Sequence, residues 1–89
     1  MNIDWLENFI VVAETLNLQK ASEKLHLTPQ AISKSIANLE KALNTRLFDR
    51  GNVIKGLTFS GEILLKNSSE IIEKINNLKL ELDEINNKE

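Results

Sequence analysis

Apolar residues recur at helical spacing from the start of the chain. One side of a 3.6-residue period carries Leu6, Phe9, Ile10, Ala13 and Leu16. This pattern predicts an amphipathic helix over residues 3–16. Either Asn2 or Asp4 caps this helix, since Asp4 and Glu7 have the spacing of a capping box. Asn17 either ends the first helix or begins the next, because Asn tolerates left-handed backbone and is also a good N-cap.

Two further helices are expected close together in the sequence. The first covers residues 19–25, and a tight turn separates it from a helix over residues 29–43. Thr28 and Pro29 mark the start of the longer helix, because Thr is a favoured N-cap and Pro is favoured at the first helical position. We expect Asn44 to end this helix in the left-handed conformation that Gly usually supplies. The core side of the longer helix carries Ile32, Ile36, Leu39 and Leu43.

A short segment with β-hairpin character follows the three helices. The apolar pairs Leu47-Phe48 and Val53-Ile54 flank residues 49–52, and glycines punctuate the segment. This arrangement predicts two short antiparallel strands joined by a turn.

Thr58 then caps a last helix over residues 59–87. Leu64, Ser68, Ile71, Ile75, Leu78, Leu82 and Ile85 recur with the alternating spacing of a coiled-coil seam. At about 1.5 Å per residue this helix spans roughly 43 Å, whereas the first 58 residues form a globule only about 27 Å across. The helix would therefore overhang its own core. We expect a second copy to cover the dimerisation seam, which consists of Ile71, Ile75, Leu78, Leu82 and Ile85.

The elements together predict a mainly α fold with one small β-hairpin. Two short helices joined by a tight turn form a helix-turn-helix, here over about residues 18–37. We expect residues 1–58 to form a winged helix-turn-helix DNA-binding domain and residues 59–89 to form a linker helix for dimerisation.

Composition excludes several other classes of function. A chain of 89 residues is one domain without a separate catalytic lobe. It has no Cys and one His, His26, so we expect no metal site, and the acidic residues form no convergent pair for catalysis. No apolar stretch is long enough to span a membrane, and Asp4 and Glu7 stand where a signal peptide would be basic. We therefore expect a cytoplasmic protein without a cofactor or a small-molecule site.

The charge distribution favours nucleic acid even though the net charge is −2. Residues 1–18 and residues 59–89 each carry a net charge of −3, whereas residues 19–58 carry +4. The basic residues of this middle segment are Lys20, Lys24, Lys34, Lys41, Arg46, Arg50 and Lys55. A local basic surface is what phosphate binding requires, whatever the total charge.

The second helix of a helix-turn-helix presents its N-terminal end to the major groove. Here the residues that point away from its core side are Gln30, Ser33, Lys34, Ala37, Asn38 and Lys41. Gln30 can form paired hydrogen bonds to adenine, and Lys34 can donate to the acceptors of guanine. Thr28 and the free N–H groups of the first turn suit a phosphate oxygen.

From Leu6 to Gly61 the sequence resembles the N-terminal domain of LysR-type transcriptional regulators. The resemblance rests on Ala21-Ser22-x-x-Leu25-His26-Leu27-Thr28, Ala31-Ile32-Ser33-Lys34-x-Ile36-x-x-Leu39-Glu40, Leu47-Phe48-x-Arg50 and Leu57-Thr58-x-x-Gly61. It implies a homodimer, paired through the last helix, on an interrupted palindrome in double-stranded DNA. It also implies a following effector-sensing domain, so we treat the chain as a fragment rather than a stand-alone short protein.

Three positions depart from the family pattern. Pro29 and Gln30 stand where the family more often has Gln and then Pro or Ser, which displaces the amide by one residue. Gln19 stands where Ser or Thr is usual, which predicts a weaker cap for the second helix. Val53 replaces the basic residue that the family usually places in the hairpin.

The predicted DNA contacts come from the helix-turn-helix and from the hairpin. They are Thr28, Pro29, Gln30, Ser33, Lys34, Asn38, Lys20, Arg50 and Lys55. The alternative is a helical protein-interaction module whose coiled coil binds a partner without DNA. That alternative explains the heptads but leaves the Thr28-Pro29 start, the basic middle segment and the hairpin without a role.

Overall fold

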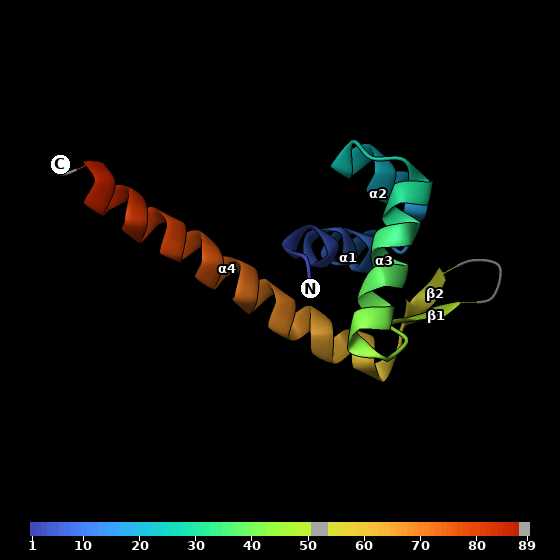
Figure 1. Cartoon of the computed structure of the whole chain (residues 1–89). Coiled ribbons are helices and arrows are strands. Elements are labelled where there is room, and N and C mark those ends of the chain that lie inside the picture. Colours follow the sequence, from blue (N-terminus) through green and yellow to red (C-terminus); the bar gives the residue numbers. More distant parts are fainter. Residues whose placement is uncertain (51–53, 88–89) are drawn as a thin grey trace.

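The computed structural model describes residues 1–50 and 54–87. Its elements follow in the order α1 (Ile3–Thr15), α2 (Leu18–Leu25), α3 (Pro29–Leu43), β1 (Phe48–Arg50), β2 (Ile54–Leu57) and α4 (Phe59–Asn87). The fold is mainly α with one antiparallel hairpin, as the sequence predicts. Figure 1 shows α1, α2 and α3 packed together with the hairpin beside α3, while α4 runs away from this group.

The sequence leaves open which residue caps the start of α1 and which residue ends it, and the structure decides both. The Asn2 side chain accepts a hydrogen bond from the Asp4 N–H at 2.7 Å, so Asn2 is the N-cap. Leu16 takes the left-handed conformation at the end of the helix, with φ 51°. This turn carries the Leu16 side chain outward to 40% exposure, so Leu16 does not continue the apolar side of α1 that the sequence predicts.

Asn17 begins α2 rather than ending α1. Its side-chain oxygen accepts from the Lys20 N–H at 2.9 Å, which satisfies one of the free donors of the first helical turn. The prediction that Gln19 weakens the cap of α2 is therefore wrong, because Gln19 lies inside the helix and the capping position belongs to Asn17.

The core lies where α1, α2, α3 and β1 meet. Its buried members are Leu6, Phe9, Val12, Ala21, Ile32, Ile36, Leu39, Leu47 and Phe48. Phe9 and Phe48 pack with their ring centroids 5.4 Å apart and their planes tilted by 53°, a favourable aromatic geometry. These rings join the first helix to the first strand, although they lie far apart in sequence. Leu43 and Trp5 pack against this core and are partly buried.

The hairpin differs in extent from the sequence-based expectation. Leu47 precedes β1, and Gly56, expected to interrupt the segment, lies inside β2 opposite Asp49. The register then shifts so that Arg50 is opposite Ile54, and Lys55 falls between the two partners. The strands are longer than the apolar pairs suggest, because backbone pairing continues through positions that carry polar side chains or none. Val53 lies outside the described residues.

Leu47 is the junction of α3, the hairpin and α4. The Leu47 N–H donates to the Glu40 carboxylate at 2.8 Å, and its carbonyl oxygen accepts from the Thr58 N–H at 3.0 Å. Thr58 caps α4, as predicted, by accepting from the Gly61 N–H at 3.0 Å, and its hydroxyl also donates to the Arg46 carbonyl at 2.6 Å.

The first half of α4 belongs to the core and the second half leaves it. Gly61 and Ser68 are buried, and Leu64, Leu65 and Ile72 pack against the core from the same helix. Beyond these residues the helix extends free of the helical group, and the molecule measures 55 × 26 × 19 Å along its principal axes. The predicted overhang of α4 is confirmed. No described helix is both long enough and apolar enough to cross a membrane.

We expect Gly61→Ala to lower the free energy of unfolding by about 1–3 kcal/mol, the usual cost of overpacking. A methyl group at Gly61 would overlap the Leu47 carbonyl oxygen, which is backbone and cannot move without breaking the junction. Gly56→Ala is the matched control, because no heavy atom lies within 4 Å of a methyl group there. Urea denaturation of both variants checks the prediction. Equal stabilities would contradict the assigned role of the Leu47 junction.

Candidate nucleic-acid interface

The turn between α2 and α3 is held by one serine. The Ser22 carbonyl accepts hydrogen bonds from the N–H groups of His26 and Leu27, and the Ser22 hydroxyl donates to the Leu27 carbonyl. His26 ends α2 in the left-handed conformation at φ 56°. Its backbone is therefore fixed by a hydrogen bond while its side chain is exposed. The turn holds the start of α3 at a defined angle to α2.

The first turn of α3 presents one unpaired backbone donor. The Thr28 side chain accepts from the Ala31 N–H at 3.1 Å, and Pro29 has no N–H group. Helix geometry leaves the Gln30 N–H without a partner inside the helix. This donor lies at the positive end of the helix dipole, where a phosphate oxygen is favoured. Thr28 and Gln30 are exposed, and Pro29 is half-buried.

One face of α3 is free to enter a groove. Gln30, Lys34, Ala37 and Lys41 are exposed, and Ser33 and Asn38 are half-buried at its margins. The opposite face is buried through Ile32, Ile36 and Leu39. The structure thus brings the predicted contacts of α3 together on one surface. Ala37 is small, so it keeps the middle of this surface low between Lys34 and Lys41.

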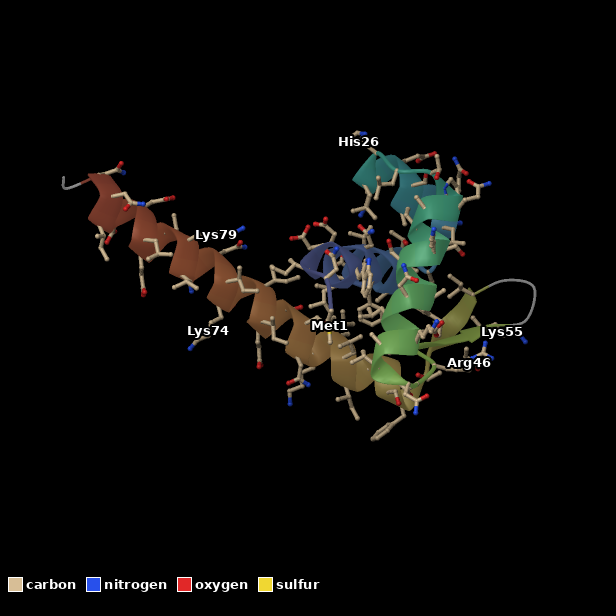
Figure 2. All side chains as sticks on the ribbon, in the orientation of Figure 1. Met1, His26, Arg46, Lys55, Lys74 and Lys79 are labelled. Atoms are coloured by element: carbon tan, nitrogen blue, oxygen red, sulfur yellow. The ribbon has the colours of Figure 1, made fainter. Side chains whose placement is uncertain are left out.

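The hairpin carries further positive charge beside α3. Figure 2 shows Arg46 and Lys55 projecting on the hairpin side of the molecule, away from the long arm of α4. Both side chains are exposed. Arg50 lies in β1, but its side chain is outside the described part of the structure, as is Val53. Lys20 is exposed on the first turn of α2.

Arg46 is a candidate contact that the sequence-based set omits. Arg46 precedes the first strand, and the sequence places it in the basic middle segment without predicting a DNA contact for it. Its backbone is fixed because its carbonyl accepts the Thr58 hydroxyl. The signal that could have identified it is its position one residue before a buried Leu-Phe pair, which forces its side chain to the outside.

Two partly buried polar contacts tie α3 to its surroundings, and sequence reasoning missed both. The Asn8 amide donates to the Ser35 hydroxyl at 3.1 Å, which links α1 to α3. The Glu40 carboxylate holds the Leu47 N–H, which links α3 to the start of the hairpin. The spacing of apolar residues predicts neither contact, because it does not show which polar residue within or beside an apolar stripe will form a hydrogen bond.

The heptad pattern of α4 is divided between the chain's own core and an uncovered face. Ser68 is buried and Leu64 is partly buried against the chain's own core. Further along, Ile71, Leu78, Leu82 and Ile85 are 44%, 52%, 51% and 60% exposed, and Ile75 is half-buried. The predicted dimer contacts therefore share one uncovered face of the described helix.

Residues 3–62 of the chain match the model of one known protein family. That family is described as the bacterial regulatory helix-turn-helix protein, lysR family. This match covers α1 to the first turn of α4. It includes every element that carries the candidate interface.

Individual relatives and a solved structure show the same similarity. A helix-turn-helix-type transcriptional regulator of Azotobacter vinelandii, named for its place in the ibpB-leuC intergenic region, is 41% identical over 86 residues, which are 97% of this chain and 60% of that protein. The Hca operon transcriptional activator HcaR of Escherichia coli is 35% identical over 80 residues, 90% of this chain and 27% of that protein. The chain thus spans 60% and 27% of the length of these two relatives.

The crystal structure of the CbnR DNA-binding domain in complex with DNA superposes with a TM-score of 0.89 at 28% identity. The superposition covers 96% of this chain and 98% of that one. The arrangement of α1 to α4 is therefore that of a winged helix-turn-helix domain with a long C-terminal helix, as the sequence predicts.

We expect Gln30→Ala and Lys34→Ala each to weaken binding to a selected duplex by about 1–3 kcal/mol more than binding to a random duplex. Both side chains project from the exposed face of α3 near its N-terminal end, where we expect the base edges to lie. Lys41→Ala is the control, since Lys41 lies on the same face two turns further along and should reach the backbone at most. Fluorescence anisotropy on both duplexes measures the difference. Equal losses on the two duplexes would assign Gln30 and Lys34 to phosphate instead.

Proposed function

The chain belongs to the lysR family of bacterial regulatory helix-turn-helix proteins, and we propose that it binds double-stranded DNA as two copies. The two copies bind the two halves of one interrupted palindrome. The chain is a LysR-type winged helix-turn-helix DNA-binding domain. We propose that it is the DNA-reading part of a bacterial transcriptional regulator. The observation that carries the proposal is the exposed face of α3, held outward by the buried Ile32, Ile36 and Leu39.

We propose that α3 enters the major groove with its first two turns. Gln30 and Lys34 then face base edges, and Ser33 and Asn38 lie at the margins of the contact. Thr28, Pro29 and the Gln30 N–H lie at the end of the helix closest to a phosphate. The hairpin approaches the neighbouring backbone with Arg46, Arg50 and Lys55, and Lys20 approaches it from α2.

We propose that this domain is a binding module rather than an enzyme, and that it works in the bacterial cytoplasm where its DNA lies. The relatives from Azotobacter vinelandii and Escherichia coli are named as transcriptional regulators. We propose a functional division at Thr58, with residues 1–58 reading DNA and residues 59–89 forming the linker helix. An interaction module without DNA binding is not favoured, because the DNA complex of CbnR shares the arrangement of the interface.

An electrophoretic mobility shift with random duplex at low salt tests the proposal directly. A basic interface binds any duplex weakly through phosphate, with Kd values typically between about 10⁻⁶ and 10⁻⁴ M at physiological salt and lower at low salt. We expect a shift that weakens as salt rises. A chain that leaves duplex DNA unshifted at low salt would contradict the proposed function.

Dimerisation is supported by the uncovered seam of α4. Apolar residues at 44% to 60% exposure recur along one helix face over Ile71 to Ile85. Such a face is unfavourable in water, and a second identical helix with the same spacing covers it by knobs-into-holes packing. A dimer would also place two copies of α3 on the same DNA, which an interrupted palindrome requires.

Charges beside the seam favour antiparallel pairing of the two α4 helices. Lys74 and Glu81 stand on one side of the seam, and both line a shallow groove with Leu78. In an antiparallel pair, Lys74 faces Glu81 of the second copy at two symmetric places. In a parallel pair, Lys74 faces Lys79 of the second copy, which brings like charges together.

We expect Leu78→Asp to weaken the dimer by about 3–6 kcal/mol, since two buried leucines are lost per dimer. The variant should sediment as a monomer at tens of micromolar and lose affinity for the selected duplex about 100-fold or more. Leu80→Asp is the matched control, because Leu80 is 63% exposed and lies about 200° around the helix from Leu78. A monomeric wild type, or equal effects of both variants, would contradict dimerisation through this seam.

We expect Lys74→Glu to weaken the dimer by roughly 1–2 kcal/mol, or about 5- to 30-fold in Kd, because the introduced carboxylate would face Glu81 of the second copy at both symmetric places. Adding Glu81→Lys should restore most of the loss. Sedimentation equilibrium of the single and double variants measures both steps. If the helices instead pair in parallel, Lys74→Glu should strengthen the dimer, because the variant replaces the repulsion between Lys74 and Lys79 with an attraction.

A further inference from the structure

Asn8 is a polar residue on the buried face of α1. It is 6% exposed, while Leu6 and Phe9 beside it are buried core residues. Burying an amide without a hydrogen-bond partner is costly, so an Asn at such a position needs a partner. That partner is supplied by a different helix.

The partner of Asn8 lies on the recognition helix α3. The Asn8 Nδ2 donates to the Ser35 Oγ at 3.1 Å, across 27 residues of sequence. Ser35 is half-buried and directly follows Lys34. Ser35 therefore lies at the edge of the buried stripe of α3, about 100° around the helix from Lys34.

The hydrogen bond adds a directional constraint to the apolar packing of α3. Ile32, Ile36 and Leu39 attach α3 to the core, and the hydrophobic effect that favours their burial is itself non-directional. A hydrogen bond limits both distance and angle. With a helix radius of about 5–6 Å including side chains, a rotation of about 10° moves a side-chain tip by about 1 Å. A displacement of this size is enough to spoil a paired hydrogen bond to a base.

We propose that Asn8 is a positioning residue for sequence recognition, which sets the rotation of α3 through its hydrogen bond to Ser35. Asn8 touches no DNA in this role. It fixes the angle at which Gln30 and Lys34 meet base edges, so it affects discrimination between sequences more than affinity for phosphate. This inference rests on the proposed DNA-binding function.

The test is the double variant Asn8→Leu with Ser35→Ala, measured against the wild type. Replacing both partners with apolar groups leaves no buried polar atom unpaired, so the domain should melt near the wild-type temperature. The probes are a duplex selected by the wild type from a random pool and a random duplex of equal length. We expect unchanged affinity for the random duplex and a discrimination ratio lowered at least about fivefold.

Two further variants separate positioning from stability. Asn8→Ser with Ser35→Asn exchanges the amide and the hydroxyl, so it should recover part of the lost discrimination. Ile36→Val removes a buried methyl group from the same interface and leaves the hydrogen bond intact. It should lower the melting temperature and keep the discrimination ratio of the wild type.

A double variant that keeps the wild-type ratio would overturn the role of Asn8 and leave the proposed function standing. Equal weakening on both duplexes would overturn it as well, since rotation of α3 affects only base contacts. A wild type that binds every duplex alike would remove the proposed sequence-specific function together with this inference.

Discussion

The backbone of Leu47 is the constraint on which the arrangement of the domain depends. Its N–H is held by Glu40 of α3, and its carbonyl is held by Thr58 at the start of α4. Gly61 packs directly against that carbonyl. One peptide segment therefore fixes where the hairpin begins and how α4 leaves the C-terminal end of α3. Both α3, proposed to read DNA, and α4, proposed to pair two copies, are attached to this junction.

Apolar periodicity and helix-end chemistry were enough to predict most of the fold. The bounds of α3 and the start of α4 follow from Thr28-Pro29, Asn44 and Thr58, whose capping roles depend on local chemistry alone. The end of α1 was less predictable, because two neighbouring residues compete for the left-handed position. Leu16 takes it, and Asn17 serves as the N-cap of α2.

The sequence was enough to predict the exposed residues of the candidate site, but not the hydrogen bonds that hold α3 in place. Gln30 and Lys34 could be assigned because the buried stripe of α3 leaves them only one direction in which to point. The contact between Asn8 and Ser35 could not be assigned, since it joins positions 27 residues apart. Ser68 shows the same limit: it continues the heptad spacing of the dimerisation seam, yet it is buried against the chain's own core. Where an apolar period serves two interfaces, only the packed structure shows the residue at which one ends.

We propose that two copies of α3, joined through α4, read two half-sites on one DNA duplex. Selection of bound duplexes from a random pool, followed by hydroxyl-radical footprinting of the enriched sequence, tests this arrangement. We expect an inverted repeat whose halves are protected on one face of the duplex, separated by whole helical turns of about 10.5 base pairs. An enriched sequence with a single unrepeated half-site, or a pool that shows no enrichment, would contradict it.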